Sequence, residues 1–464
     1  MADKDAFVLG PEVYMERRNR VREAVGGGVV LWLGHIQQPR NYVANAYPFR
    51  QNSHFLYFTG LAQPDLALLS YPERDFDVLF CRQPTMDDIV WSGAGCDRID
   101  MARHAGVETV ESIDRLGIYL TDARSKGLPI HYLPPYQASS LFRMAELLVI
   151  DPTEVVPGKS ERLVEEVVRQ RSIKSDPEIA EIEDALAVTS EMYRFAMAER
   201  RPGVYEYDIA GGMQGAALRR NRQQAFQPIV SVHGEILHNE CYMNRLEDGN
   251  LLLIDSGAES VHFYASDITR TFPVSGKFTP AQAEIYDLVL RVQLGSIDKI
   301  KPGISFRDVH LEACRIMVEG LRDVGLVKGK TADAIEAGAH ALFLPHGLGH
   351  MLGLDVHDME DLGDAVGYPK GEKRSSQFGL NFLRLTRVLE PGMVVTVEPG
   401  IYFIPALIDR WQQERAQQEF IDYDKLARFR SFGGVRIEDD VLVTGTGCRV
   451  LGPEIPKSIA EICC

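Results

Sequence analysis

The sequence lacks any apolar run long enough to cross a bilayer, and its polar N-terminus lacks the apolar core of a secretory signal. It also lacks a CxxC pair among its seven cysteines, which lie at 81, 96, 241, 314, 448, 463 and 464. These absences argue against a membrane span, a disulfide framework and a thiolate zinc site. We therefore expect a cytoplasmic protein with no membrane partner, whose cysteines are buried and reduced.

Basic clusters are absent too. No group of Lys and Arg is interleaved with aromatic residues, and the formal net charge is −16. Because this charge repels a phosphate backbone, we expect no nucleic-acid partner. The chain has neither a GxSxG segment for a serine nucleophile nor a GxxxxGK[ST] segment for a phosphate loop.

The length of 464 residues predicts two domains. Residues 1–172 contain short apolar runs bounded by Gly, Pro or Asp, which predict buried strands in GGGVVLWLG, FLYFTG, LALLSY and FDVLFC. LFRMAELLV and SERLVEEVVRQRSI show helical spacing instead. We expect an α/β domain over 1–172 and a second domain over 173–464.

The second domain contains an internal repeat. Helices predicted to begin at Ser175 and Thr279 end at Arg-Pro-Gly (201–203) and Lys-Pro-Gly (301–303), and a further helical segment follows each. LEDGNLLLIDSG (246–257) then aligns with LEPGMVVTVEPG (389–400), which places Asp255 on Glu398. The chain therefore has two related halves, each of which ends an apolar strand in a carboxylate.

Four carboxylates are candidates for one site. Taken singly, Asp255 is also compatible with a strand-end turn and Glu398 with a sheet edge. Asp267, however, lies in a strand-like run that returns from the Asp255 strand, and Glu438 shares one strand face with Arg436. Ionised carboxylates in apolar strands are costly unless something compensates them. Their neighbours Asp439 and Asp440 are expected to be exposed turn acids.

The segment PHGLGHMLGLDVHD (345–358) adds His346, His350 and His357, among Pro and Gly residues that argue against a helix. Converging acids repel one another unless cations neutralise them, and two divalent ions would do so. The oxygen-rich set favours Mn, Co or Mg over structural zinc. Paired ions orient a water and polarise the carbonyl that it attacks, so the pattern predicts a metal-dependent hydrolase.

Five segments in this order resemble the signature motifs of the pita-bread metallopeptidases, in the branch of proline dipeptidase and aminopeptidase P. They are LLLIDSG, ASDITRTFPVSGKF, PHGLGHMLGLDVHD, VVTVEPG and GGVRIEDD. The resemblance implies an α/β protein with a creatinase-like N-terminal α/β domain and a C-terminal pita-bread domain of duplicated α+β structure. It also implies a homodimer.

The resemblance further implies the roles of individual residues. Two divalent ions, Mn first with Co, Zn or Mg as alternatives, would be bound by Asp255, Asp267, His350, Glu398 and Glu438, with Asp267 and Glu438 bridging them. Glu398 would also move the proton between the water and the leaving proline nitrogen. The other residues implied in catalysis are His238, His346, His357 and Arg436, and those implied in substrate binding are His238, His357, Arg384 and Arg436.

Two substrate lengths remain open. YPFRQNSHFLYFTG and the WSG step at Trp91 resemble the N-terminal domain of aminopeptidase P, which acts on longer peptides. Arg384, in contrast, stands where proline dipeptidases clamp the carboxylate of a dipeptide, unless it is an ordinary surface arginine. We predict a dipeptidase for Xaa-Pro substrates, with aminopeptidase P as the alternative and a metal-free peptide-binding module as a remote one.

One irregularity lies between the two aspartates. Asp255 and Asp267 are separated by one residue more than is usual in the family. We expect the hairpin loop around residues 260–262 to absorb the extra residue, because otherwise Asp267 would face the wrong side of its strand. His262 lies beside this insertion and is assigned no role.

Overall fold

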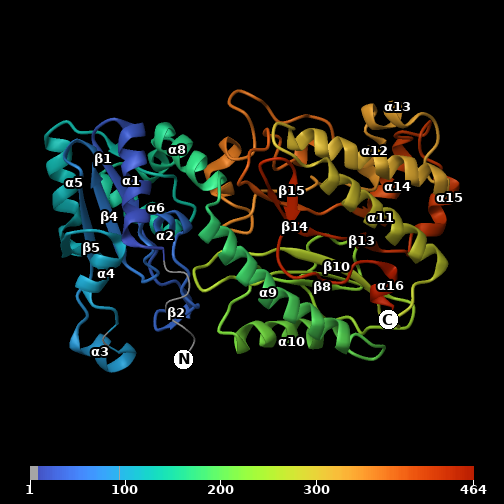
Figure 1. Cartoon of the computed structure of the whole chain (residues 1–464), viewed down its shortest axis with the longest axis horizontal. Coiled ribbons are helices and arrows are strands. Elements are labelled where there is room, and N and C mark those ends of the chain that lie inside the picture. Colours follow the sequence, from blue (N-terminus) through green and yellow to red (C-terminus); the bar gives the residue numbers. More distant parts are fainter. Residues whose placement is uncertain (1–8, 94, 464) are drawn as a thin grey trace. The chain divides into compact units, whose positions relative to one another are not determined.

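The computed structural model describes residues 9–93 and 95–463, and the chain divides into two compact units. The first unit runs to Arg171 and includes a returning segment, Met359–Ala365. The second contains Ser172–Asp358 and Val366–Cys464. Figure 1 colours both along the sequence. Within the described residues, no helix has both the length and the apolar character that a membrane crossing requires.

The first unit is built on a mixed sheet with the strand order β6-β5-β4-β1-β7. Its central strands β1, β4 and β5 are antiparallel neighbours, whereas β6 and β7 join the two edges in parallel. The strands are β1 (Val29–Leu33), β4 (Leu66–Tyr71), β5 (Phe76–Cys81), β6 (Thr109–Ser112) and β7 (Ile130–His131), and a separate pair is formed by β2 (Pro39–Tyr42) and β3 (Asn45–Ala46).

Helices surround this sheet in the first unit. They are α1 (Pro11–Val25), α2 (Ser53–Thr59), α3 (Met86–Ser92), α4 (Arg98–Ala105), α5 (Leu116–Ser125), α6 (Ala138–Leu148), α7 (Pro152–Val155) and α8 (Glu161–Ser172). The strands predicted in GGGVVLWLG, LALLSY and FDVLFC are confirmed as β1, β4 and β5, and the two predicted helices as α6 and α8.

The strand predicted in FLYFTG is wrong, because these residues form the last turns of α2. The Asn52 side chain accepts a hydrogen bond from the backbone N–H of Phe55, which begins the helix, and Gly60 ends it with φ of 68°. All residues of α2 are buried. A short apolar run that is buried on every side shows no alternation of polar and apolar residues, so its pattern cannot distinguish a strand from a helix. Here the capping residues are the features that indicate a helix.

The second unit contains the repeated helix pairs. In the first pair α9 (Asp176–Glu199) lies beside α10 (Glu206–Arg219), and in the second α11 (Pro280–Lys299) lies beside α12 (Phe306–Val324) (Figure 1). The predicted starts are confirmed, since Ser175 and Thr279 are the N-cap residues of α9 and α11. Shorter helices are α13 (Thr331–Glu336), α14 (Pro405–Glu414), α15 (Tyr423–Leu426) and α16 (Ile459–Ile462).

Each of the two halves also contains an equivalent backbone hydrogen bond. The N–H of Gly203 donates to the carbonyl of Leu246 at 2.8 Å, and that of Gly303 donates to the carbonyl of Leu389 at 2.9 Å. Each of these leucines begins the aligned segment that leads into a carboxylate-bearing strand. The duplication seen in the sequence is therefore a duplication of structure.

Three small sheets complete the second unit. Their orders are β10-β9-β8, β11-β14-β15 and β12-β13. The strands are β8 (Ile229–Ser231), β9 (Leu251–Ser256), β10 (Ile268–Pro273), β11 (Val394–Val397), β12 (Gly400–Tyr402), β13 (Gly434–Arg436), β14 (Asp439–Val443) and β15 (Cys448–Val450). A bridge between Thr269 and Glu438 connects the two halves.

The cysteines only partly follow the prediction. Cys81 and Cys314 are buried free thiols, as expected, but Cys96, Cys241 and Cys463 are free and exposed. Cys464 lies outside the described residues. The exposed cysteines lie outside the apolar elements, where no packing demands burial.

Candidate metal centre

The first two carboxylates come from the hairpin of β9 and β10. Asp255 lies opposite Thr269 in the antiparallel register. Asp267 precedes Thr269 by two residues, so both aspartates point to the same face. The chain between them makes a tight turn, in which Phe263 has φ of 69° and its N–H donates to the carbonyl of Ser260.

The second two carboxylates come from the equivalent strands of the other half. Val397 of β11 pairs with Asp439 of β14, Glu398 directly follows Val397, and Glu438 directly precedes Asp439. The expected continuous strand through Arg436 and Glu438 is interrupted, because β13 ends at Arg436 and β14 begins at Asp439. The backbone N–H of Glu438 donates instead to the carbonyl of Thr269 at 3.1 Å, which brings the two pairs of acids together.

The histidine segment 345–358 contains no α-helix, as predicted. His350 is held by its backbone N–H, which donates to Thr396 Oγ1 at 3.1 Å, and by its ring Nδ1, which lies 3.0 Å from the carbonyl of Met351. This contact places the ring proton on Nδ1. The lone pair of Nε2 is therefore the one that can bind a metal ion. Nε2 lies 3.4 Å from Asp267 Oδ2 and 3.8 Å from Glu398 Oε1.

All the site residues proposed from the sequence line one cavity of about 920 Å³ in the second unit. They are Asp255, Asp267, His350, Glu398, Glu438, His238, His346, His357, Arg384 and Arg436. Sequence reasoning missed further residues of the same wall, among them Arg374, Phe378 and Arg410. Nothing in the spacing of these three distinguishes them from surface residues.

The donor set fits divalent cations. Donor atoms of Asp267, His350 and Glu438 lie within 4.8 Å of one another. Asp255 Oδ1, Asp267 Oδ1 and Glu438 Oε1 are buried and accept no hydrogen bond from any described residue. Burial, together with the neighbouring carboxylates, raises the pKa of Asp267 and of Glu438 well above the ordinary range. Cations would both satisfy these oxygens and remove the repulsion.

Arg436 orients the acids through hydrogen bonds. Its guanidinium donates to Asp255 Oδ2 at 2.6 Å, to Thr269 Oγ1 at 3.0 Å and to the Tyr402 hydroxyl at 3.0 Å. The Thr269 hydroxyl in turn donates to Glu438 Oε2 at 2.6 Å. Burial disfavours the charged guanidinium, but Tyr402 and Asp255 outweigh it and raise the pKa of Arg436. The cation therefore persists and orients two carboxylates.

Tyr402 links Arg436 to His346 and was missed by sequence reasoning. Its hydroxyl lies 2.9 Å from His346 Nε2, and the carbonyl of Gly347 lies 2.7 Å from Nδ1 of the same ring. Burial lowers the pKa of His346 to about 3 and raises that of Tyr402 to about 12, so both groups are neutral at pH 7. The sequence contains a signal for this residue. Tyr402 lies an even number of positions after Glu398 in an extended segment, so both side chains are expected on the same face.

The other two histidines of this segment are also neutral. Burial lowers the pKa of His350 to about 4 and that of His357 to about 2. Their rings lie 4.3 Å apart between centroids. His262, to which no role was assigned, instead lies 2.8 Å from Glu181 Oε1.

The prediction that Asp439 and Asp440 are exposed turn acids is wrong. Both are buried, because residues of other elements contact their side chains, among them Gln293 of α11 at Asp439 and Asp267 at Asp440. Asp439 pairs with Arg270 at 2.7 Å and with Lys457, which together overcome burial and hold its pKa below the usual value. Asp440 Oδ2 accepts the backbone N–H of Asp267 at 3.0 Å, so it positions a neighbouring carboxylate.

Comparison with known families matches both units. Residues 180–445 match metallopeptidase family M24, and residues 14–128 match the N-terminal domain of aminopeptidase P. Human Xaa-Pro dipeptidase is 32% identical over 98% of this chain and 92% of its own length. Xaa-Pro aminopeptidase of Escherichia coli K12 is 34% identical over 98% and 97%.

Solved structures agree with these matches. Aminopeptidase P from E. coli with the inhibitor Pro-Leu has a TM-score of 0.79 at 32% identity, and the match covers 98% of each chain. Aminopeptidase PepP of Pseudomonas aeruginosa has a TM-score of 0.80 at 29% identity over 99% and 98%. The fold class expected from the sequence, an aminopeptidase P-like domain followed by a pita-bread domain, is confirmed. The relatives carry both activity names at similar identity.

Proposed function

Because the chain belongs to metallopeptidase family M24, we propose that it hydrolyses the peptide bond before proline, with Xaa-Pro dipeptides as its preferred substrates. The observation that carries this proposal is the shared cavity. Arg384 lines the same cavity as the four carboxylates and His350, so the carboxylate of a short substrate can be held beside the metal centre.

We propose that Asp255, Asp267, His350, Glu398 and Glu438 hold two divalent ions, preferably Mn. When bound, such ions supply positive charge that activates a water and polarises the scissile carbonyl. The preference for Mn over a softer ion follows from the donor set, which has four carboxylates, one imidazole and no sulfur.

The remaining cavity residues act on the substrate in this proposal. Glu398 receives the proton of the attacking water and delivers it to the proline nitrogen, a transfer for which a carboxylate in contact with the site is suited. His238 and His357 orient the peptide. Arg436 contacts the substrate carbonyl as negative charge develops. His346 lines the same pocket and is held by its contact with Tyr402.

Aminopeptidase P activity is the second candidate. It is supported by the match to the N-terminal domain of aminopeptidase P. It is also supported by the cavity volume of about 920 Å³, which is larger than the volume of a dipeptide. Arg374 and Arg410 also line this cavity, so they would offer additional positive charge to a longer peptide.

A three-substrate comparison tests the proposal. We expect kcat/KM for Ala-Pro to exceed that for Ala-Pro-amide and for Ala-Pro-Ala by at least about tenfold, the effect of one lost charged contact. The amide has the length of the dipeptide without its charge, so it separates charge from length. Preference for Ala-Pro-Ala would replace the dipeptidase assignment with aminopeptidase P, and no hydrolysis with Mn present would contradict both.

A further inference from the structure

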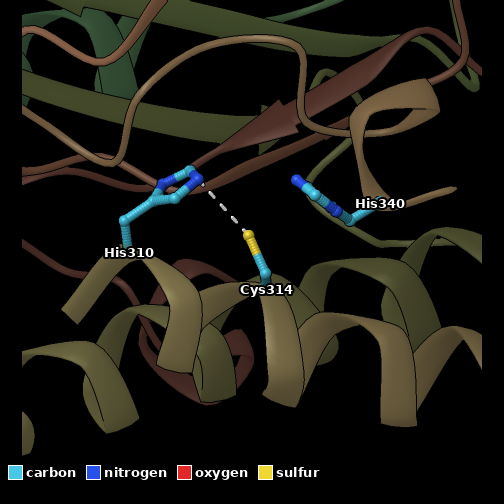
Figure 2. Close-up of side chains that lie close together, drawn as sticks. All are labelled: His310, Cys314 and His340. Carbon is cyan, nitrogen blue, oxygen red and sulfur yellow. Dashed lines mark hydrogen bonds between the residues drawn. The ribbon is translucent and has the colours of Figure 1, made fainter. Parts of the chain in front are cut away.

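A second cluster of metal-binding side chains, made of other residues than the carboxylate centre, lies in the second unit. It consists of His310 and Cys314 on α12 and of His340 on the 3₁₀ helix η3 (Ala339–Leu342). Figure 2 shows the Cys314 sulfur between the two imidazole rings. His310 and Cys314 are four positions apart, so they share one face of the helix.

The donor atoms of this cluster are close together. One nitrogen of each ring and the sulfur lie within 4.8 Å of one another, and Cys314 Sγ is 3.5 Å from His310 Nε2. Metal bonds of about 2.0 to 2.3 Å place ligand atoms roughly 3.5 to 4 Å apart. Small side-chain rotations would therefore close the cluster around a single ion.

The cluster is buried and incompletely hydrogen-bonded. All three residues are at most 1% exposed. Nδ1 of His310 and both ring nitrogens of His340 make no hydrogen bond with the described residues. The carbonyl of Ile335 faces His340 and partly opposes the effect of burial on its pKa, but its geometry falls short of a hydrogen bond. An unsatisfied buried nitrogen destabilises the folded state, and ordinary core packing would avoid it with apolar residues.

The protonation states suit metal binding. Burial lowers the pKa of His310 to about 3 and that of His340 to about 4, so both rings are neutral and offer a lone pair at pH 7. Burial also raises the pKa of the Cys314 thiol, which therefore keeps its proton until a cation replaces it.

We propose that His310, Cys314 and His340 form a further metal site, which holds one soft cation, Cu(I) or Zn(II). Thiolate and imidazole are preferred ligands of both ions, and a trigonal set of two His and one Cys is typical of copper. On binding, one metal–sulfur bond and two metal–nitrogen bonds form, the S–H bond breaks, and its proton leaves to solvent. The site differs from the carboxylate centre, which contains no sulfur and suits harder ions.

The sequence argued against a thiolate metal site because no CxxC pair is present. Here the ligands come from a helix and from a separate turn, 26 positions apart at Cys314 and His340, so no short spacing marks them. The turn leads directly into the histidine segment 345–358. A bound ion would thus attach the start of that segment to α12.

Metal content tests this proposal independently of peptidase activity. The protein is prepared with the exposed Cys96, Cys241 and Cys463 replaced by Ser, and also with Cys464→Ser, so that these four thiols cannot bind the probe. Its carboxylate centre is filled with Mn. Cu(I) under reducing conditions, or Zn(II) in a second arm, is supplied both during expression and after purification, because a buried site requires transient opening. Bound metal is counted by elemental analysis, and sulfur ligation is read by X-ray absorption.

We expect one Cu or Zn per chain with a sulfur ligand, a raised unfolding temperature, and loss of that ion in Cys314→Ala. His340→Gln should weaken binding at least tenfold. Cys81→Ala, which removes another buried thiol, should bind as the parent does. The proposal is overturned if the folded parent binds no such ion by either route, if the ion has only oxygen and nitrogen ligands, or if Cys314→Ala retains it.

Discussion

At the scale of single residues, the proposed preference for dipeptides depends on Arg384, which lines the cavity. A guanidinium can hold a terminal carboxylate with two parallel hydrogen bonds, which an amide cannot match. We predict that Arg384→Ala raises KM for Ala-Pro about 10- to 100-fold, as expected for a lost charged contact, while the Mn content is unchanged. Steady-state kinetics and elemental analysis measure both quantities.

Arg374→Ala is the matched control for that prediction, because Arg374 lines the same cavity. It stacks on the Tyr368 ring, with 5.0 Å from its guanidinium carbon to the ring centroid. Its removal should leave KM for the dipeptide within about threefold. If Arg374→Ala raises KM and Arg384→Ala does not, the clamp is Arg374.

Tyr402 is a positioning residue, since its hydroxyl contacts both His346 and Arg436. We predict that Tyr402→Phe lowers kcat about tenfold, the effect of one lost buried hydrogen bond, while KM and metal content change little. Tyr368→Phe is the control, because its buried hydroxyl donates to the carbonyl of Leu383 at 2.7 Å. A similar loss of kcat in both variants would show a general packing effect instead.

At the scale of elements, the returning segment Met359–Ala365 is attached to the first unit by buried polar contacts. Arg171 donates to Nδ1 of His54 at 2.8 Å, and Nε2 of His54 lies 3.0 Å from Asp361 Oδ2. Burial alone would raise the pKa of Asp361, but His54 and Arg171 outweigh burial and lower it. The carboxylate thus stabilises the folded unit in its charged form.

This pKa shift makes the contribution depend on pH. A carboxyl whose folded pKa is lowered stabilises the protein above its unfolded pKa, about 3.9 for Asp, and loses that effect as pH falls through the folded pKa. We predict that Asp361→Asn lowers stability at pH 7 by about 1.5 to 3 kcal/mol, and that the difference shrinks below pH 4. The free energy of unfolding, measured with urea at pH 7 and below pH 4, tests this prediction. Asp364→Asn, at an exposed position, is the control. A difference that is constant with pH would contradict the assignment.

At the scale of the whole molecule, the proposed metal centre would couple folding to cation binding. The four carboxylates belong to both halves of the repeat, and the net charge of −16 adds a general repulsion. We predict that chelation abolishes peptidase activity and lowers the unfolding temperature, and that Mn restores both. Mn at a concentration 100 times Kd should add about 2.7 kcal/mol for each site.

Glu438→Gln provides the matched control for metal removal. It keeps the shape of the side chain but removes one charge, so Mn should raise its unfolding temperature much less than that of the parent. Equal stabilisation of parent and variant, measured by calorimetry, would show that Mn acts elsewhere on the molecule.

The sequence by itself determined the duplication, the capped helices and the types of residue at the strand ends. Local patterns suffice there, because a capping serine, a Pro-Gly stop or an apolar run ending in Asp acts over a few residues. The same local signals failed for α2, since a run buried on every side has no period to read.

Only the tertiary structure decided which of these groups meet. Asp255 and Glu438 are far apart in sequence, and they line one cavity because the Thr269–Glu438 bridge joins the two halves. Asp439 and Asp440 are buried because distant residues cover their side chains: Arg270, Gln293 and Lys457 contact Asp439, and the backbone of Asp267 contacts Asp440. His310, Cys314 and His340 likewise come together through packing alone. Burial and long-range contact depend on neighbours that no local pattern specifies.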